Sequence, residues 1–142
     1  MGVDIGTKRM SVSMGYGSFL AFRTEVAKAF SDEFGQKYRK YLDDSLRAYT
    51  SFLNSDAELA KLDKEFNSYL KTVSIDDDVV DFLFQPDLEG KITYKTARKV
   101  RDLCRKSKCK NKFGYVFDQR SMTEISEIFD DAVKHRCNVR WS

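Results

Sequence analysis

The sequence predicts an α+β fold, mostly helical with a small antiparallel sheet, in a single globular domain over residues 1–142. The length of 142 residues is that of one typical domain. A single Pro and 33% charged residues favour a helix-rich fold over a β-sandwich or an array with long linkers. Apolar residues recur every three or four positions over most of the chain and alternate over one short stretch. Several helices and little sheet are therefore expected.

The first half of the chain is expected to hold one strand and then three helices. Residues 8–14 alternate between apolar and polar side chains, which predicts a half-buried strand. Helical spacing predicts three helices in order, over about 19–31, 38–53 and 56–73. Ser18 is expected to cap the first helix and Gly35 to separate it from the second, while Ser55 and Glu58 form a capping box for the third.

The second half is expected to alternate short irregular segments with two further helices. The expected elements are a short apolar run over 79–84 before Pro86, a turn over 87–90, a helix beginning after Thr93, a polar connector over 107–112, a short strand over 113–117, and a last helix beginning after Ser121 or Thr123. Residues 138–142 are expected to be a short tail.

Positive charge is concentrated in one segment of this half. Residues 91–112 carry ten Lys and Arg against Asp102 alone, a net charge of +9, whereas residues 1–90 sum to −5 and residues 113–142 to −1. The candidate partner-binding residues are Lys95, Arg98, Lys99, Arg101, Arg105, Lys106, Lys108 and Lys110. Such a segment can bind nucleic-acid phosphates or an acidic protein surface, and in many proteins it is only a solvated surface.

The C-terminal third holds all three cysteines and the only histidine: Cys104, Cys109, His135 and Cys137. A Cys pair followed by a distant His/Cys pair is typical of small zinc sites, and four protein ligands fill a tetrahedral site. We therefore predict a structural Zn²⁺ that ties the last helix to the helix before the connector. The alternative is that Cys104 is a core residue, Cys109 an exposed thiol and His135 a helix-end residue.

No complete catalytic motif is found in the sequence. Gly15-Tyr16-Gly17 lacks the third glycine of a dinucleotide-binding loop, because Leu20 stands there, although Tyr16 and Arg23 could still form a contact surface. The acidic run over 76–78 is better explained as a helix start than as a metal site. With His135 taken as a metal ligand, no Ser–His or Cys–His pair remains, and enzyme activity is not expected.

Location is predicted from what the sequence does not contain. No apolar run approaches the roughly 18 residues that a membrane span needs. The first residues show no charged region followed by an apolar stretch, as a secretory signal would. We expect no membrane contact and a cytoplasmic location with reduced thiols.

Both ends of the chain carry motifs that resemble a known group of proteins. The motifs are Val3-Asp4-Ile5, residues 13–19 with Phe22-Arg23, His135-Arg136-Cys137 and Arg140-Trp141. They resemble small proteins of streptococcal-type phages and prophages, some of which look like anti-CRISPR proteins that block the RNA-guided nuclease of type II systems. In that pattern cysteines often stand at the positions of Leu88 and Ala97, and this chain has neither.

The resemblance and the basic segment lead to two function hypotheses. The first is a non-enzymatic, phage-encoded inhibitor that binds the CRISPR effector nuclease in the host bacterial cytoplasm and blocks target DNA binding or cleavage. The alternative is a nucleic-acid-binding accessory protein of a phage or mobile element that acts through the basic segment 91–112. A third and weaker hypothesis is a metal-dependent enzyme that uses the acidic run 76–78.

Overall fold

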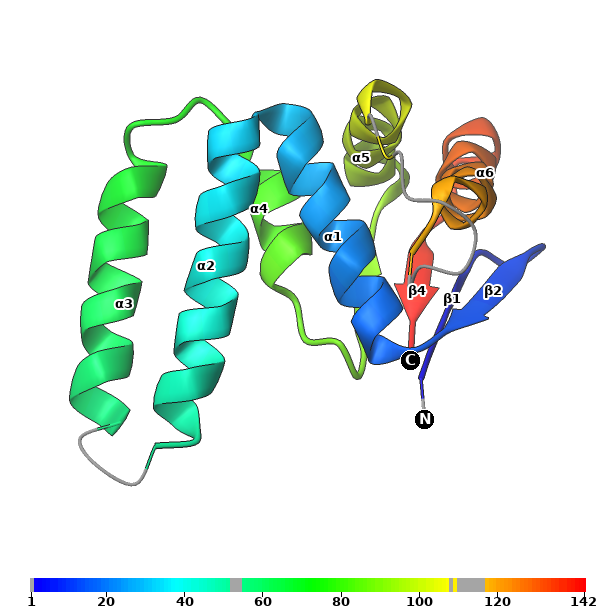
Figure 1. Ribbon diagram of the computed structural model, residues 1–142. Coiled ribbons are helices and arrows are strands. Elements are labelled where there is room, and N and C mark those ends of the chain that lie inside the picture. The colour runs from blue at the N-terminus through cyan, green and yellow to red at the C-terminus, as the bar shows by residue number, and fades with distance from the viewer. Residues whose placement is uncertain (1, 52–54, 108, 110–116) are drawn as a thin grey trace.

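The computed structural model describes residues 2–51, 55–107, 109 and 117–142, which form six helices and one four-stranded sheet (Figure 1). The elements in chain order are β1 (Val3–Gly6), β2 (Ser11–Met14), α1 (Tyr16–Phe30), α2 (Asp32–Tyr49), α3 (Ser55–Leu70), α4 (Asp77–Phe84), β3 (Gly90–Ile92), α5 (Tyr94–Lys106), α6 (Gln119–His135) and β4 (Val139–Trp141). The predicted α+β class, mostly helical with a small antiparallel sheet, is confirmed.

The sheet joins the two ends of the chain. Its strand order is β2-β1-β4-β3, so β1 and β4 are the inner strands. Ile5 of β1 lies opposite Val12 on one side and Trp141 on the other. The pairing extends one step further, because the Asp4 amide donates to the Ser142 carbonyl at 2.9 Å and the Ser142 amide to the Asp4 carbonyl at 3.1 Å.

The prediction of a tail over 138–142 is wrong, because β4 is an inner strand of the sheet. Val139 and Trp141 are buried and Arg140 is exposed, so the strand does alternate. Three residues are too few for that alternation to be recognised in a sequence. The pairing partners in β1 and β3 lie far away along the chain, and only the fold brings them together.

The first helix ends near residue 31 as predicted, but the second begins earlier than predicted. Ser31, not a residue near Gly35, separates the helices, and its hydroxyl caps α2 by accepting a bond from the Phe34 amide at 3.0 Å. Gly35 lies inside α2, where a Cβ atom would be 2.8 Å from the Cα of Lys28 on α1. The glycine therefore permits close packing of two helices rather than ending one of them.

The last helix begins earlier than expected. Asp118 caps α6, because its carboxylate accepts bonds from the Ser121 amide at 2.8 Å and from the Ser121 hydroxyl at 2.9 Å. Ser121 is thus the capped residue and not the cap. Most of the predicted strand over 113–117 lies outside the described residues. The helix expected after Thr93 is confirmed as α5.

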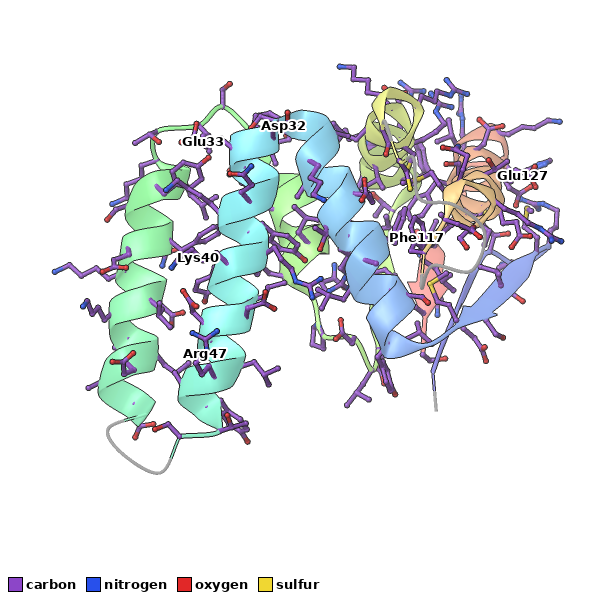
Figure 2. All side chains as sticks on the ribbon, in the orientation of Figure 1. Asp32, Glu33, Lys40, Arg47, Phe117 and Glu127 are labelled. Carbon is purple, nitrogen blue, oxygen red and sulfur yellow. The ribbon has the colours of Figure 1, made fainter. Side chains whose placement is uncertain are left out.

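Aromatic side chains connect the sheet with three of the helices. Trp141 of β4 packs against Phe19 of α1 and Phe82 of α4, each at a ring-centroid distance of 5.6 Å. Phe22 of α1 packs against Phe129 of α6 at 5.7 Å and against Phe117 at 5.8 Å. Phe117 is labelled in Figure 2. This cluster holds α1, α4 and α6 on the sheet, while the α2–α3 hairpin lies on the far side of α1 (Figure 1).

The helices α5 and α6 pack against each other in antiparallel orientation. Arg101, midway along α5, reaches Asp130 of α6 at 3.3 Å. The N-terminal end of α5 and Arg136, the residue that follows α6, line one hollow. None of the helices that the structure describes is long and apolar enough to cross a membrane.

Candidate functional site

The candidate site is the solvent side of α5 together with the adjoining end of α6, and we name it the basic surface. Its residues are Lys95, Arg98, Lys99, Arg105, Lys106 and Arg136. Ala97, Val100 and Cys104 are buried on the opposite side of α5, which turns the cations outward. Two further candidates, Lys108 and Lys110, lie outside the described residues.

Several predicted partner-binding residues are engaged within the chain. Arg101 and Arg105 both contact Asp130 of α6 at 3.3 Å, and only 17% of the Arg101 side chain is exposed. Arg101 therefore holds the two helices together rather than facing a partner. Lys99 contacts Asp76 at 3.0 Å and Asp78 at 2.9 Å, and hydrogen bonds to these carboxylates raise its pKa.

The same contacts explain the acidic run over 76–78. Asp76 precedes α4 as its N-cap residue but makes no side-chain cap bond, while Asp78 lies in the first turn. Both carboxylates instead bind Lys99. The run thus joins α4 to α5. Within the described ranges there is no group of three or more His, Cys, Asp or Glu side chains that could hold a metal.

The remaining cations of the basic surface have no carboxylate partner among the described residues. Lys95, Arg98, Lys106 and Arg136 are exposed, and no ion pair to them occurs in the described part of the chain. Arg98 and Arg136 line the same hollow, together with Tyr94, Lys95 and Lys99. Arg136 adopts a left-handed backbone conformation (φ 51°, ψ 48°) that ends α6. Charges of one sign therefore gather where α5 begins and α6 ends.

The cysteine–histidine set is divided between the two ends of the α5–α6 pair. Cys104 is only 5% exposed, burial raises the pKa of its thiol to about 12, and it is hydrogen-bonded to Ser126 of α6. Cys109 is also buried, in contrast to the exposed thiol of the alternative hypothesis. His135 lies nine positions after Ser126 in α6, which is roughly 13 Å along a helix axis.

Cys137 contacts the β1–β2 hairpin instead, while His135 faces Asp131 of its own helix. The Nε2 atom of His135 lies 3.5 Å from Asp131, and the Arg9 guanidinium donates to the Cys137 sulfur at 3.5 Å. Zinc ligands lie about 2.0–2.3 Å from the ion, so side chains on opposite ends of a helix pair cannot share it. As arranged, these residues do not fit a common zinc site, and the zinc stays a prediction that metal analysis must test.

Arg23 is a functional candidate that the structure places in the core. It is 3% exposed, so the prediction that it forms a contact surface is wrong. Its guanidinium lies 4.3 Å from the centre of the Phe19 ring and donates to the Gln85 carbonyl at 2.6 Å. It also pairs with Asp87 at 3.3 Å. Burial lowers its pKa. The side chain therefore anchors the loop that follows α4.

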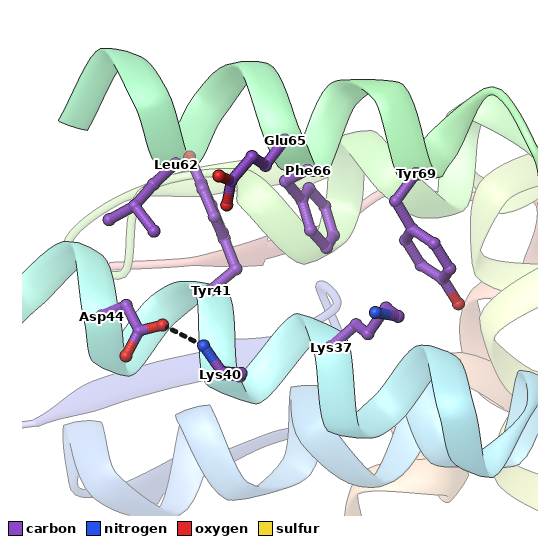
Figure 3. A pocket seen from close by; sticks show the side chains of 8 residues that line it. All are labelled: Lys37, Lys40, Tyr41, Asp44, Leu62, Glu65, Phe66 and Tyr69. Atoms are coloured by element: carbon purple, nitrogen blue, oxygen red, sulfur yellow. Dashed lines mark hydrogen bonds and ion pairs between the residues drawn. The ribbon is translucent and has the colours of Figure 1, made fainter. Parts of the chain in front are cut away.

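A cavity of about 180 Å³ between α2 and α3 escaped the sequence analysis (Figure 3). Its lining residues are Lys37, Lys40, Tyr41, Asp44, Leu62, Glu65, Phe66 and Tyr69. Tyr41 and Phe66 stack at 4.6 Å and form an apolar wall, while Lys40 pairs with Asp44 at 2.7 Å. Because that cation and carboxylate are already paired, the cavity offers weaker recognition of a charged ligand than the basic surface.

Comparisons with known proteins add no further information. The chain matches no protein-family model, no curated protein sequence and no solved structure.

Proposed function

We propose that this protein is a non-enzymatic, nucleic-acid-binding accessory protein of a phage or mobile element, and that it contacts nucleic acid through the basic surface. The observation that supports this best is the presence of four exposed cations on α5 and at the end of α6 without a carboxylate partner in the described structure. Phosphate contacts by Lys and Arg supply most of the affinity in binding that does not depend on nucleotide sequence.

The arrangement of these cations suits a strand of phosphates. Lys95 and Arg98 lie one turn apart near the start of α5, and Lys106 is the last residue of that helix. A separation of eleven residues from Lys95 to Lys106 corresponds to roughly 16 Å, which spans several phosphates of an extended strand. Arg101 and Asp130 fix α5 against α6, so the cations are held on a rigid support.

A binding test with matched charge variants examines the proposal. The double variant Lys95→Gln/Lys106→Gln removes two exposed cations of the basic surface, and Lys61→Gln/Lys64→Gln removes two exposed cations of α3. In gel shifts with single-stranded and duplex oligonucleotides, we expect the first variant to bind more weakly than the wild type and the second to bind equally. Equal weakening by both variants, or no binding by the wild type, contradicts the proposal.

Inhibition of a type II CRISPR effector nuclease is the second candidate, favoured by the resemblance of the chain ends. The residues that carry the resemblance include Val3, Ile5, Phe19, Arg23 and Trp141, all of which are buried. They specify the core more than a partner surface, which is why we rank this function second. Co-purification with an effector, together with loss of DNA cleavage by that effector in vitro, would support inhibition. The absence of a complex with any of several effectors would contradict this function.

A further inference from the structure

We propose that the hollow between the start of α5 and the end of α6 binds a terminal phosphate monoester of a nucleic-acid strand. This inference rests on the proposed function and assigns a ligand group to one part of the basic surface. The hollow has a volume of about 440 Å³ and is lined by Tyr94, Lys95, Arg98, Lys99 and Arg136. No carboxylate is among these lining residues.

The hollow brings like charges together from two segments that are far apart in the sequence. Arg98 belongs to α5. Arg136 is the C-cap residue of α6 and has a left-handed backbone conformation. Without an anion these guanidinium groups repel each other, so binding of an anion lowers the free energy of the arrangement. Arg also presents several N–H donors in a fixed plane that suits phosphate oxygens.

The charge of the site favours a dianion. Four cations line the hollow, and the only carboxylates bound to them in the described structure are Asp76 and Asp78 on Lys99. Two positive charges are thus left unbalanced. A phosphate monoester carries a charge of about −1.5 to −2 at pH 7, whereas a phosphodiester within a strand carries about −1.

The start of α5 adds a favourable field to the cation-lined hollow. Thr93, the N-cap residue, makes no side-chain cap bond, and the first turn of α5 contains no acidic residue. The amide groups of this turn are therefore not occupied by a side-chain cap, and the helix dipole favours negative charge there. Tyr94, the first residue of α5, also lines the hollow and is half-buried, which leaves part of its ring for the adjoining sugar or base.

The test compares otherwise identical oligonucleotides that end in a 5′-phosphate or in a 5′-hydroxyl, and repeats the comparison with a 3′-phosphate. Fluorescence anisotropy of the 142-residue chain should show about tenfold tighter binding to one of the phosphorylated oligonucleotides, the effect of one or two charged hydrogen bonds. The variants Arg98→Gln and Arg136→Asn should abolish this preference. Asn is chosen at position 136 because it tolerates the left-handed conformation.

The control is Arg120→Gln, which removes the same charge near the start of α6, where Arg120 pairs with Glu124. It should keep the preference for the terminal phosphate. Equal affinity for phosphorylated and unphosphorylated ends overturns the inference but leaves the proposed function in place. Binding of a nucleoside monophosphate in the absence of any oligonucleotide binding would instead support the phosphate site and contradict the proposed function.

Discussion

Arg23 shows how a single charged residue can be part of the core. Its guanidinium lies among the rings of Phe19, Phe82 and Trp141 at 4.3–5.5 Å from their centres. Nη1 donates all of the hydrogen bonds described for the guanidinium group, to the carbonyls of Leu83 and Gln85 and to Asp87. Nε and Nη2 are buried without a partner in the described structure. The favourable contacts are thus cation–π interactions and the bonds to the loop carbonyls.

Replacement of Arg23 should therefore destabilise the protein. We expect Arg23→Ala to lower the free energy of unfolding by about 2–5 kcal/mol, as for other large side chains removed from a core. Arg23→Met keeps more of the apolar contact and should cost about 1–3 kcal/mol through the lost hydrogen bonds. Urea unfolding measures both values. Arg39→Ala, which breaks an exposed pair with Asp43, should change stability by less than about 1 kcal/mol. An equal effect of Arg23→Ala and Arg39→Ala would contradict this description of the core.

At the residue scale, the sequence predicts the outward direction of charged side chains on a helix better than it predicts which charged side chain is buried. The outward direction of Lys95 and Arg98 follows from helical periodicity, which is a local property. The burial of Arg23 does not, because the rings that surround it come from α1, α4 and β4. Gly90 is a similar case: a Cβ atom there would overlap the ring of Trp141, a contact between residues 51 positions apart.

At the scale of elements, Asp131 ties the β1–β2 hairpin to α6. Its carboxylate accepts from the Thr7 hydroxyl at 2.7 Å and from Arg9 Nε at 3.3 Å. The Thr7 bond and the nearby Arg9 lower the pKa of Asp131 below its ordinary value of 3.8. Since the folded-state pKa is the lower one, this carboxylate adds stability above pH 3.8 and loses that contribution as the pH falls through the folded-state pKa.

The pH dependence gives a prediction for Asp131→Asn. At pH 7 the variant should be less stable than the wild type, because the hydrogen-bonded negative charge is lost. The difference should shrink as the pH falls below about 4, where the carboxyl of the unfolded wild-type chain begins to take up a proton, and disappear below the lower folded-state pKa. Urea unfolding of both proteins over a pH series measures this. A difference that is constant from neutral to acidic pH would show that the charge of Asp131 contributes nothing.

The predicted zinc also belongs to the scale of elements, since it was expected to join α5 to α6. Elemental analysis of protein purified without added metal should give about one zinc per chain if the four residues share an ion, and Cys109→Ala should lower that content. Such a result would require the end of α6 to move relative to Cys104, given their separation in the structure. Metal-free protein of normal stability would contradict the zinc prediction.

The sequence predicts that most of the helices exist, but it predicts their first and last residues less well. Apolar periodicity predicts five of the helices, because apolar side chains at helical spacing cover one side of each. These helices are α1, α2, α3, α5 and α6. The caps depend on single hydrogen bonds such as Ser31 to Phe34 and Asp118 to Ser121. Several neighbouring polar residues could make such bonds, and the sequence alone does not choose among them.

At the scale of the whole molecule, the sheet and the α5–α6 pair place the functional candidates. The strands β1 and β4 join the two ends of the chain, and β4 follows α6 after a short turn through Arg136. That turn carries Arg136 to the start of α5. The basic segment was evident in the sequence, but its completion by Arg136 required the antiparallel packing of α5 and α6. The same packing places Arg101, a predicted partner-binding residue, against Asp130 of α6.

The measurement that tests the central claim most directly is the salt dependence of oligonucleotide binding. If Lys95, Arg98, Lys106 and Arg136 each neutralise one phosphate of duplex DNA, log K should fall against log salt concentration with a slope of about −3 to −4. Arg98→Gln should make that slope less negative by about 1, and Arg120→Gln should leave it unchanged. A slope near zero, or no binding at about 50 mM salt, would show that the basic surface does not bind nucleic acid.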